Sequence, residues 1–308
     1  MRLSQYVSEH GVDAFNFEDF LFVGSKLATD PTRLVLVGGQ AIETWGHYFD
    51  VLAPTGQREP LTEDTDWYGN AEDALWLCRL LGRRNTELYI AKNFDPSPNS
   101  AQAYIERPDG RVLMMDFLRA VVGLTHEEIV QYAVPVNVAG VNLSVLHPLY
   151  CLESRLANLR GLPSKRNTNG VMQANWAIEI AAAYLEKMPS NGASVRDVMK
   201  ACRQLADCSE YRAGPYCFEH YQVDPLRAVT PTTLDFVGGQ FVTEYWPRRI
   251  ERISTKRERN RRLVAYRFDL STARAAKATA IPIRSSVPLT VRAPTTDAGQ
   301  ERDAPSQH

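Results

Sequence analysis

The sequence has few cysteines, and their arrangement excludes two common classes of protein. There are five among 308 residues, an odd number with no Cys-x-x-Cys pair. Disulfide-framework domains and zinc ribbons both require paired cysteines at short, regular spacings. The cysteines therefore indicate reduced thiols in a reducing compartment.

Long apolar runs and a dominant charge are lacking as well. No run approaches the roughly 18 to 20 residues of a membrane helix, and the opening MRLSQYVSEHGVDAF lacks the layout of a signal peptide. Lysine and arginine number 35 against 36 acidic residues, a net charge of −1 that gives no global attraction to nucleic acid or to an anionic membrane. The sequence predicts a cytoplasmic protein without a membrane partner, on which any basic surface is local.

What is present is the pattern of an α+β protein. Hydrophobic residues make up 44% and charged residues 23%, as in ordinary globular domains. Short strand-like runs alternate with amphipathic segments over residues 1–143, which predicts a mixed sheet with an N-terminal helix. Longer amphipathic segments predict a mostly helical domain over residues 144–268. Residues 269–308 are rich in Ala, Thr, Ser and Pro, a composition that predicts a disordered tail.

A glycine pair follows the first predicted strand. Residues 33–37 read RLVLV, and Gly38-Gly39 then precede an apolar-periodic segment that predicts a helix. Such a turn lets backbone amides approach a phosphate, and the helix dipole favours negative charge there. The pair is neither a Walker loop nor a Rossmann fingerprint. A simple tight turn would leave the same pattern.

Three aspartates are candidate metal ligands. Asp64 and Asp66 lie two apart in a predicted strand, so both point to one face, where a divalent cation such as magnesium relieves their repulsion. Asp116 interrupts the apolar run VLMMDFL, where a buried carboxylate requires a partner. That partner is either a salt bridge or helix cap in the core, or a metal ion shared with Asp64 and Asp66.

The order of these features resembles the polymerase-beta-like nucleotidyltransferase superfamily. Over residues 30–190 the sequence is most similar to the AbiEii-type proteins, the nucleotidyltransferase toxins of abortive-infection toxin–antitoxin systems. The similarity lies in VGGQAIETW, LTEDTDWYG, VLMMDFL and HPLYCLESRLANLRGLPSKR. The resemblance implies a polymerase-beta-like core followed by a mostly helical domain. It also implies that Asp64, Asp66 and Asp116 are catalytic and bind two Mg²⁺ ions, and that Gly38, Gly39 and Lys165 bind the nucleotide.

The implied activity is magnesium-dependent transfer of a nucleoside monophosphate from an NTP to an acceptor, with release of pyrophosphate. The resemblance favours a tRNA-like RNA acceptor, a role as a toxin in a toxin–antitoxin or phage-defence system, and a cognate antitoxin protein as a candidate partner. Two alternatives stay open. One is a small-molecule, aminoglycoside-type nucleotidyltransferase, and the other is an inactive binding module of the same fold.

A local basic surface is also predicted. From Arg248 to Arg262 the chain reads RRIERISTKRERNRR, with eight basic residues and two glutamates. A helix of this composition is suited to an RNA backbone. It is equally suited to a solvated face or to a salt-bridge network between domains.

Overall fold

The computed structural model describes residues 2–54, 64–92 and 97–279. The chain up to Asn260 forms one compact unit, and the residues from Arg261 belong to a second. None of the helices in the described ranges has the length and apolarity needed to cross a membrane.

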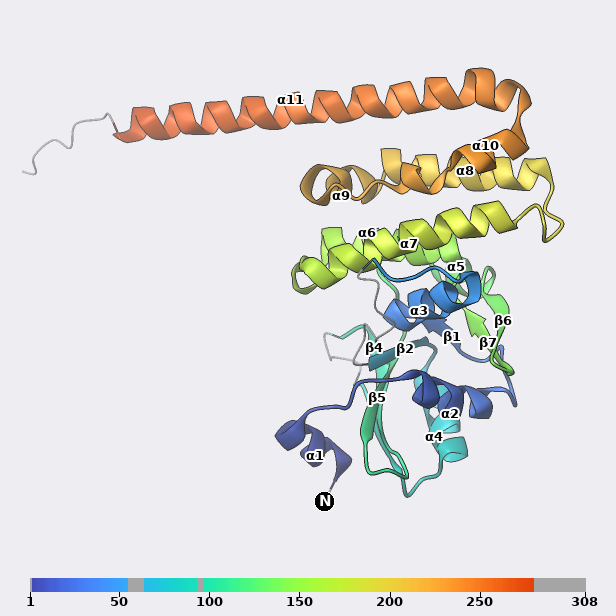
Figure 1. Ribbon diagram of the computed structural model, residues 1–308. Helices are drawn as coiled ribbons and strands as arrows, with labels where there is room; N and C mark the ends of the chain where they lie inside the picture. The colour runs from blue at the N-terminus through green and yellow to red at the C-terminus, as the bar shows by residue number, and fades with distance from the viewer. Residues whose placement is uncertain (1, 55–63, 93–96, 280–308) are drawn as a thin grey trace, which may run out of the picture. The chain divides into compact units, whose positions relative to one another are not determined.

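Within the described residues, seven strands form one mixed sheet (Figure 1) in the order β3-β4-β5-β2-β1-β7-β6. The central strand β2 runs parallel to β5 and antiparallel to β1, which in turn is parallel to β7. The remaining neighbours pair antiparallel. The predicted α+β class, a mixed sheet followed by a mostly helical region, is confirmed. The strands are β1 (Val35–Val37), β2 (Asp64–Tyr68), β3 (Thr86–Ile90), β4 (Asn99–Glu106), β5 (Val112–Leu118), β6 (Val134–Val138) and β7 (Val141–Val145).

Helices α2 and α4 begin at side-chain caps that the sequence supplies. Asn70 accepts hydrogen bonds from the backbone of the first turn of α4, and Asp73 closes a capping box by accepting from the Asn70 backbone. Asn16 and Asp19 form the same motif at α2. The helices are α1 (Leu3–His10), α2 (Phe17–Leu27), α3 (Gly38–Phe49), α4 (Ala71–Leu81) and α5 (His126–Val130).

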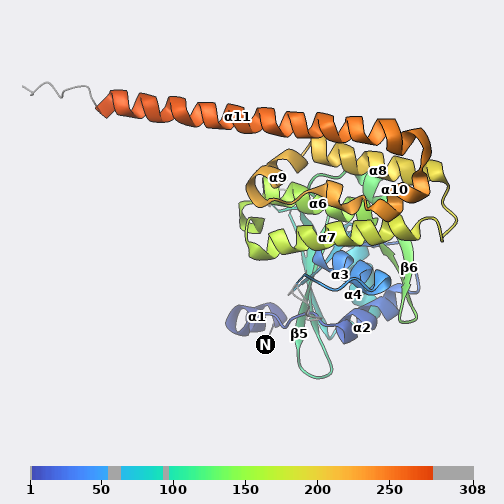
Figure 2. The same cartoon turned by 45° about the horizontal axis from the view of Figure 1, so that its top comes forward.

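The second half is helical from Pro148 onward. Figures 1 and 2 show α6 to α10 gathered on one side of the sheet region. The two regions are joined through α3, which packs against α6 and α7. The elements are α6 (Pro148–Gly161), α7 (Thr168–Lys187), α8 (Val195–Glu210), α9 (Gly214–Tyr221), α10 (Pro231–Val237) and α11 (Trp246–Thr279), with the short turns η1 (Pro163–Lys165) and η2 (Pro225–Ala228) and the π-helical η3 (Phe241–Tyr245).

The two predicted domain limits, after residues 143 and 268, fall inside elements of the structure. The sheet continues across residue 143, because β7 extends to Val145. The helix α11 continues to Thr279, past residue 269, where composition predicts the start of disorder. Residues 280–308 of the predicted tail lie outside the described residues.

The two faces of the sheet differ in burial. On β5, the side chains of Leu113, Met115 and Phe117 are completely buried, and they form one face together with Ala101 and Ala103 of β4. Helix α4 packs on β3 and β4. The opposite face carries side chains that are only partly buried, namely Gln102 and Tyr104 of β4 and Met114, Asp116 and Leu118 of β5. This second face is the one that holds the polar side chains of the candidate site.

A buried ion pair fixes the β4–β5 hairpin to α2. Asp19 has no exposed surface and accepts from Arg107 at 2.9 Å and from Arg111 at 2.8 and 2.9 Å. The turn of the hairpin has the sequence Pro-Asp-Gly, and its glycine, Gly110, adopts a φ of +86°. The strand that carries Asp116 is thereby fixed at its N-terminal end.

Candidate active site

The glycine turn between β1 and α3 lies directly against an aspartate. Gly38 adopts a φ of +69°, a conformation that L side chains rarely adopt. A Cβ atom at this position would lie 2.0 Å from Oδ2 of Asp66. Only glycine therefore allows the turn and the Asp66 carboxylate to approach each other this closely.

Asp66 and Asp116 are register partners on the parallel strands β2 and β5. Neighbouring strands are about 4.8 Å apart, and residues paired in register point to the same face. Both side chains are partly buried. On its other side, Asp66 pairs with Val37, the residue before the glycine turn. The fold thus places two carboxylates side by side next to the start of α3.

Asp64 begins β2, where its backbone pairs with Met114. Its side chain lies outside the described part of the chain. Among the side chains that are described, no group of three His, Cys, Asp or Glu residues converges as metal ligands do. The participation of Asp64 in a triad with Asp66 and Asp116 therefore stays a prediction.

The surroundings of Asp116 differ from the sequence expectation. The apolar run VLMMDFL predicts a strand buried on both faces, but Met114, Asp116 and Leu118 occupy the partly exposed face of β5. Asp116 accepts a hydrogen bond from Gln102, whose Nε2 donates to Oδ1 at 2.8 Å. This hydrogen-bond donor is a neutral amide on the neighbouring strand β4.

Gln102 belongs to a polar chain that sequence reasoning missed. The Tyr104 hydroxyl donates to Oε1 of Gln102 at 2.8 Å, and Gln102 then donates to Asp116. Burial raises the pKa of Tyr104, and the nearby carboxylates of Asp116 and Glu87 raise it further. The sequence does contain a signal for this chain: Gln102 and Tyr104 are two residues apart in a predicted strand, so their side chains lie on the same face.

The other predicted nucleotide-binding residues lie at two places. Gly39 follows Gly38 in the first turn of α3 and is buried. Lys165 is exposed in the 3-10 turn η1, between α6 and α7. The contact of either residue with a nucleotide stays a prediction.

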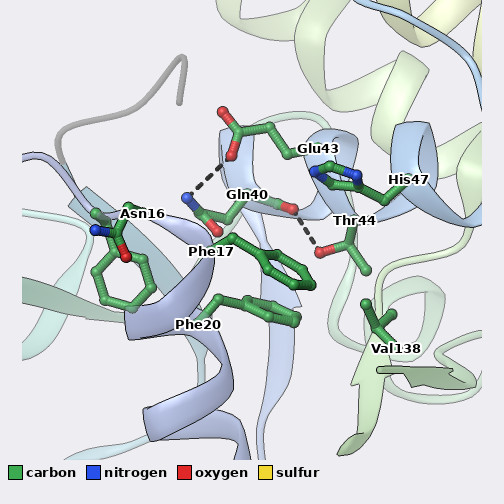
Figure 3. A pocket seen from close by; sticks show the side chains of 9 residues that line it. Asn16, Phe17, Phe20, Gln40, Glu43, Thr44, His47 and Val138 are labelled. Carbon is green, nitrogen blue, oxygen red and sulfur yellow. Dashed lines mark hydrogen bonds between the residues drawn. The ribbon is translucent and has the colours of Figure 1, made fainter. Parts of the chain in front are cut away.

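A small cavity next to the glycine turn is too small for a nucleotide. It measures about 40 Å³ and lies between α2 and α3, where Figure 3 shows Gln40, Thr44 and His47 facing Phe17 and Phe20. The Gln40 side chain donates to Glu43 at 3.1 Å. Small-molecule sites usually measure about 300 to 1,000 Å³, whereas a single water occupies about 30 Å³. The cavity therefore has room for about one water molecule.

The basic segment from Arg248 to Arg262 is partly neutralised by acidic residues. Arg249 and Arg252 contact Glu210 at 3.0 and 2.8 Å, and Arg249 also pairs with Asp207. Arg257 forms a bidentate pair with Asp224 at 2.7 and 2.8 Å. These pairs fit the salt-bridge interpretation of the segment better than a continuous surface for RNA.

The donor set of the site fits magnesium. Carboxylate oxygens are hard ligands, which this cation prefers. The side-by-side placement of Asp66 and Asp116 on a partly exposed face makes a shared cation electrostatically favourable. The glycine turn leaves room for the Asp66 carboxylate at the same place.

Comparisons with known proteins find no related sequence but do find a structural likeness. No protein-family model matches the chain, and no curated protein matches it. Among solved structures, the chain is similar to the solution structure of the antibiotic-resistance factor ANT(2'')-Ia, with 14% identity and a TM-score of 0.33, over 66% of this chain and 99% of that one. A TM-score of 0.33 is too low to transfer an activity. The functional assignment therefore depends on the geometry of the site.

Proposed function

We propose that the protein is a polymerase-beta-like nucleotidyltransferase, an enzyme that transfers a nucleoside monophosphate from an NTP to an acceptor hydroxyl and releases pyrophosphate. The observation that carries the proposal is the pairing of Asp66 with Asp116 directly beside the Gly38 turn. This places paired carboxylates and a glycine turn at a helix N-terminus within one small region. Transfer of a nucleotidyl group requires both parts. The carboxylates act at the reacting phosphorus, and the glycine turn holds the rest of the triphosphate.

Each part of the site has a role in this proposal. The backbone amides at Gly38 and Gly39 hold the triphosphate at the start of α3, where the helix dipole stabilises negative charge. Gln102 holds Asp116 in one orientation through its amide. Lys165 is the candidate cation for the triphosphate from the helical region.

Asp64, Asp66 and Asp116 would hold the metal. Two magnesium ions bound there supply charge neutralisation for the triphosphate and lower the pKa of the acceptor hydroxyl. Asp116 is the candidate to face the acceptor oxygen, because the Gln102 amide holds it in one orientation.

We propose RNA as the acceptor and a toxin role with a cognate antitoxin, on the strength of the AbiEii resemblance. The ion pairs of Arg249, Arg252 and Arg257 reduce the support that the basic segment gives to this choice. A small-molecule acceptor of the aminoglycoside type and an inactive binding module are therefore kept as outcomes of the test.

The test is incubation of the full chain with each labelled NTP, magnesium and total cellular RNA, followed by gel separation. A labelled RNA band is the expected result, and its size identifies the acceptor. A parallel reaction offers a panel of aminoglycosides instead of RNA. If a labelled product forms only in that reaction, the acceptor is a small molecule and not RNA.

A calorimetric titration with each NTP, with and without magnesium, tests the activity class. An active nucleotidyltransferase is expected to bind at least one NTP in a magnesium-dependent manner. No magnesium-dependent binding and no labelled product would contradict the enzyme proposal and leave a binding module.

A further inference from the structure

A second cavity lies in the helical region, between α8, η3 and the first turns of α11. Its volume is about 550 Å³, and we refer to it as the arginine cleft. Arg203, Arg248, Arg249 and Arg252 contribute to its lining, with Glu244 as the lining carboxylate. Two aromatic residues of η3, Phe241 and Tyr245, also line the cleft.

Arg203 is held in place by the two aromatic rings. Its guanidinium carbon lies 5.0 Å from the ring centroid of Tyr245 and 5.8 Å from that of Phe241. The rings stack on each other with centroids 5.1 Å apart. A guanidinium stacked on a ring keeps its N–H donors at its edge, where they form a planar fork that matches a phosphate. The π-helical turn, which places Phe241 and Tyr245 together, thus preorganises Arg203 for an anion.

The arginines of the cleft differ in whether they form salt bridges. Arg249 and Arg252 already contact Glu210, and Arg249 also contacts Asp207. Arg203 and Arg248 take part in none of the salt bridges found among the described residues. The cleft therefore has two cationic side chains available, opposed by the single lining carboxylate of Glu244.

Two available arginines match one phosphate group and not a long polyanion. A nucleic-acid strand requires a continuous track of cations along its backbone. The next basic side chains of α11 are engaged elsewhere, since Lys256 donates to the Glu210 carbonyl at 2.9 Å and Arg257 pairs with Asp224. The volume of about 550 Å³ lies within the usual range of about 300 to 1,000 Å³ for small-molecule sites.

We propose that the arginine cleft binds the phosphate group of a small molecule, of which a mononucleotide is the best-matched size. Arg203 and Arg248 bind the phosphate, and the remaining volume accommodates the organic part of the ligand. This site is separate from the Asp66 and Asp116 carboxylates. It does not depend on the proposed function.

The experiment is calorimetric titration of the full chain with inorganic phosphate, AMP and adenosine. EDTA is present, so that metal-dependent binding at the carboxylate site is suppressed. The proposal expects AMP to bind, adenosine not to bind, and inorganic phosphate to compete with AMP. Equal affinities for AMP and phosphate would identify free phosphate as the ligand, and tighter binding of AMP would identify a phosphorylated organic molecule; both results support the site.

Arginine variants test whether AMP binds in the arginine cleft. Arg203→Ala and Arg248→Ala are each expected to weaken AMP binding by at least about tenfold, as expected for loss of a charge-assisted contact. Arg203→Lys keeps the charge but loses the planar fork, so it should also weaken binding while the fold is retained. Arg259→Ala removes the same charge from an exposed position of α11 outside the cleft lining, and it should change the affinity less than twofold.

Two results would overturn the proposal. One is AMP binding that is absent, or that the Arg203 and Arg248 variants leave unchanged while circular dichroism shows them folded. The other is a single-stranded RNA decamer that binds much more tightly than AMP and depends on Arg203, because the occupant would then be a polymer. Neither result bears on the transfer assay, in which magnesium and the carboxylates are tested.

Discussion

Gln102 and Asp116 are bonded across the antiparallel pair β4–β5, with the Gln102 amide donating to Oδ1 of Asp116 at 2.8 Å. The same glutamine accepts from the Tyr104 hydroxyl. A carboxylate with one oxygen fixed in this way presents its other oxygen in a defined direction. Gln102 is therefore a positioning residue for the proposed activity, and Tyr104 supports it from two residues further along the same strand.

Gln102→Leu should lower the rate of nucleotidyl transfer by about 10- to 100-fold, the usual effect of losing a residue that orients a metal ligand. The magnesium concentration for half-maximal rate should rise, because Asp116 is no longer held. Tyr104→Phe removes only the outer hydrogen bond and should have a smaller effect in the same direction. A magnesium titration of the initial rate checks this, and an unchanged midpoint for Gln102→Leu would show that the bond has only a structural role.

Asp66→Asn should affect stability and activity differently, because it removes both a charge next to Asp116 and a proposed metal ligand. The register places Asp66 beside Asp116, so removing one charge should leave the magnesium-free protein equally stable or slightly more stable. Activity should fall by about a thousandfold or more, because a proposed metal ligand is lost. Thermal melts with and without magnesium check this, and the variant should lose the magnesium-induced rise in Tm. Asp235→Asn, at an exposed position of α10, should keep that rise. A destabilised Asp66→Asn that still responds to magnesium would exclude Asp66 as a ligand.

Gly38→Ala should disturb the carboxylate directly. The new Cβ would lie 2.0 Å from Oδ2 of Asp66, and the φ of +69° is unfavourable for alanine. We expect a loss of about 1 to 3 kcal/mol in the free energy of unfolding together with loss of transfer activity. Gly110→Ala is the matched control, because its φ is +86° and an added Cβ would have nothing within 4 Å. If the two variants behave alike in denaturant titrations and in activity, the Asp66 contact has no specific role.

His147 should make the stability depend on pH. Its Nδ1 accepts from the Leu149 backbone N–H at 3.2 Å and caps α6, while Nε2 lies 2.9 Å from the Tyr184 hydroxyl. Burial lowers the pKa of His147 to about 4, against an ordinary value of 6.5. The unfolded chain therefore binds a proton more readily, and stability is fully present above pH 6.5 and falls as the pH decreases toward 4, by up to about 3 kcal/mol. Urea titrations at several pH values check this. His147→Asn retains a capping side chain and should flatten the dependence in this window; an unchanged profile would assign it to other groups.

The sequence by itself determined the local elements and the chemistry-bearing residues of the first half. Asn70 with Asp73 predicts the start of α4, because a capping box depends only on residues within one turn. The glycine pair predicts the turn after β1, and Pro-Asp-Gly predicts the β4–β5 hairpin. Each of these signals acts over a few residues, so the sequence can be interpreted without knowledge of the fold.

Only the tertiary structure decided which residues meet across the chain. Periodicity places Asp66 and Asp116 on strands, but the parallel pairing of β2 with β5, and not with some other strand, makes them neighbours. The same holds for β7, whose alternating sequence VNLSV is typical of a strand but does not indicate that its neighbour is β1. The partner of Asp116 also follows from the register of β4, since a shift by one residue would turn Gln102 to the buried face. Strand order and register depend on packing between residues distant in the sequence, and these long-range contacts have no local signature.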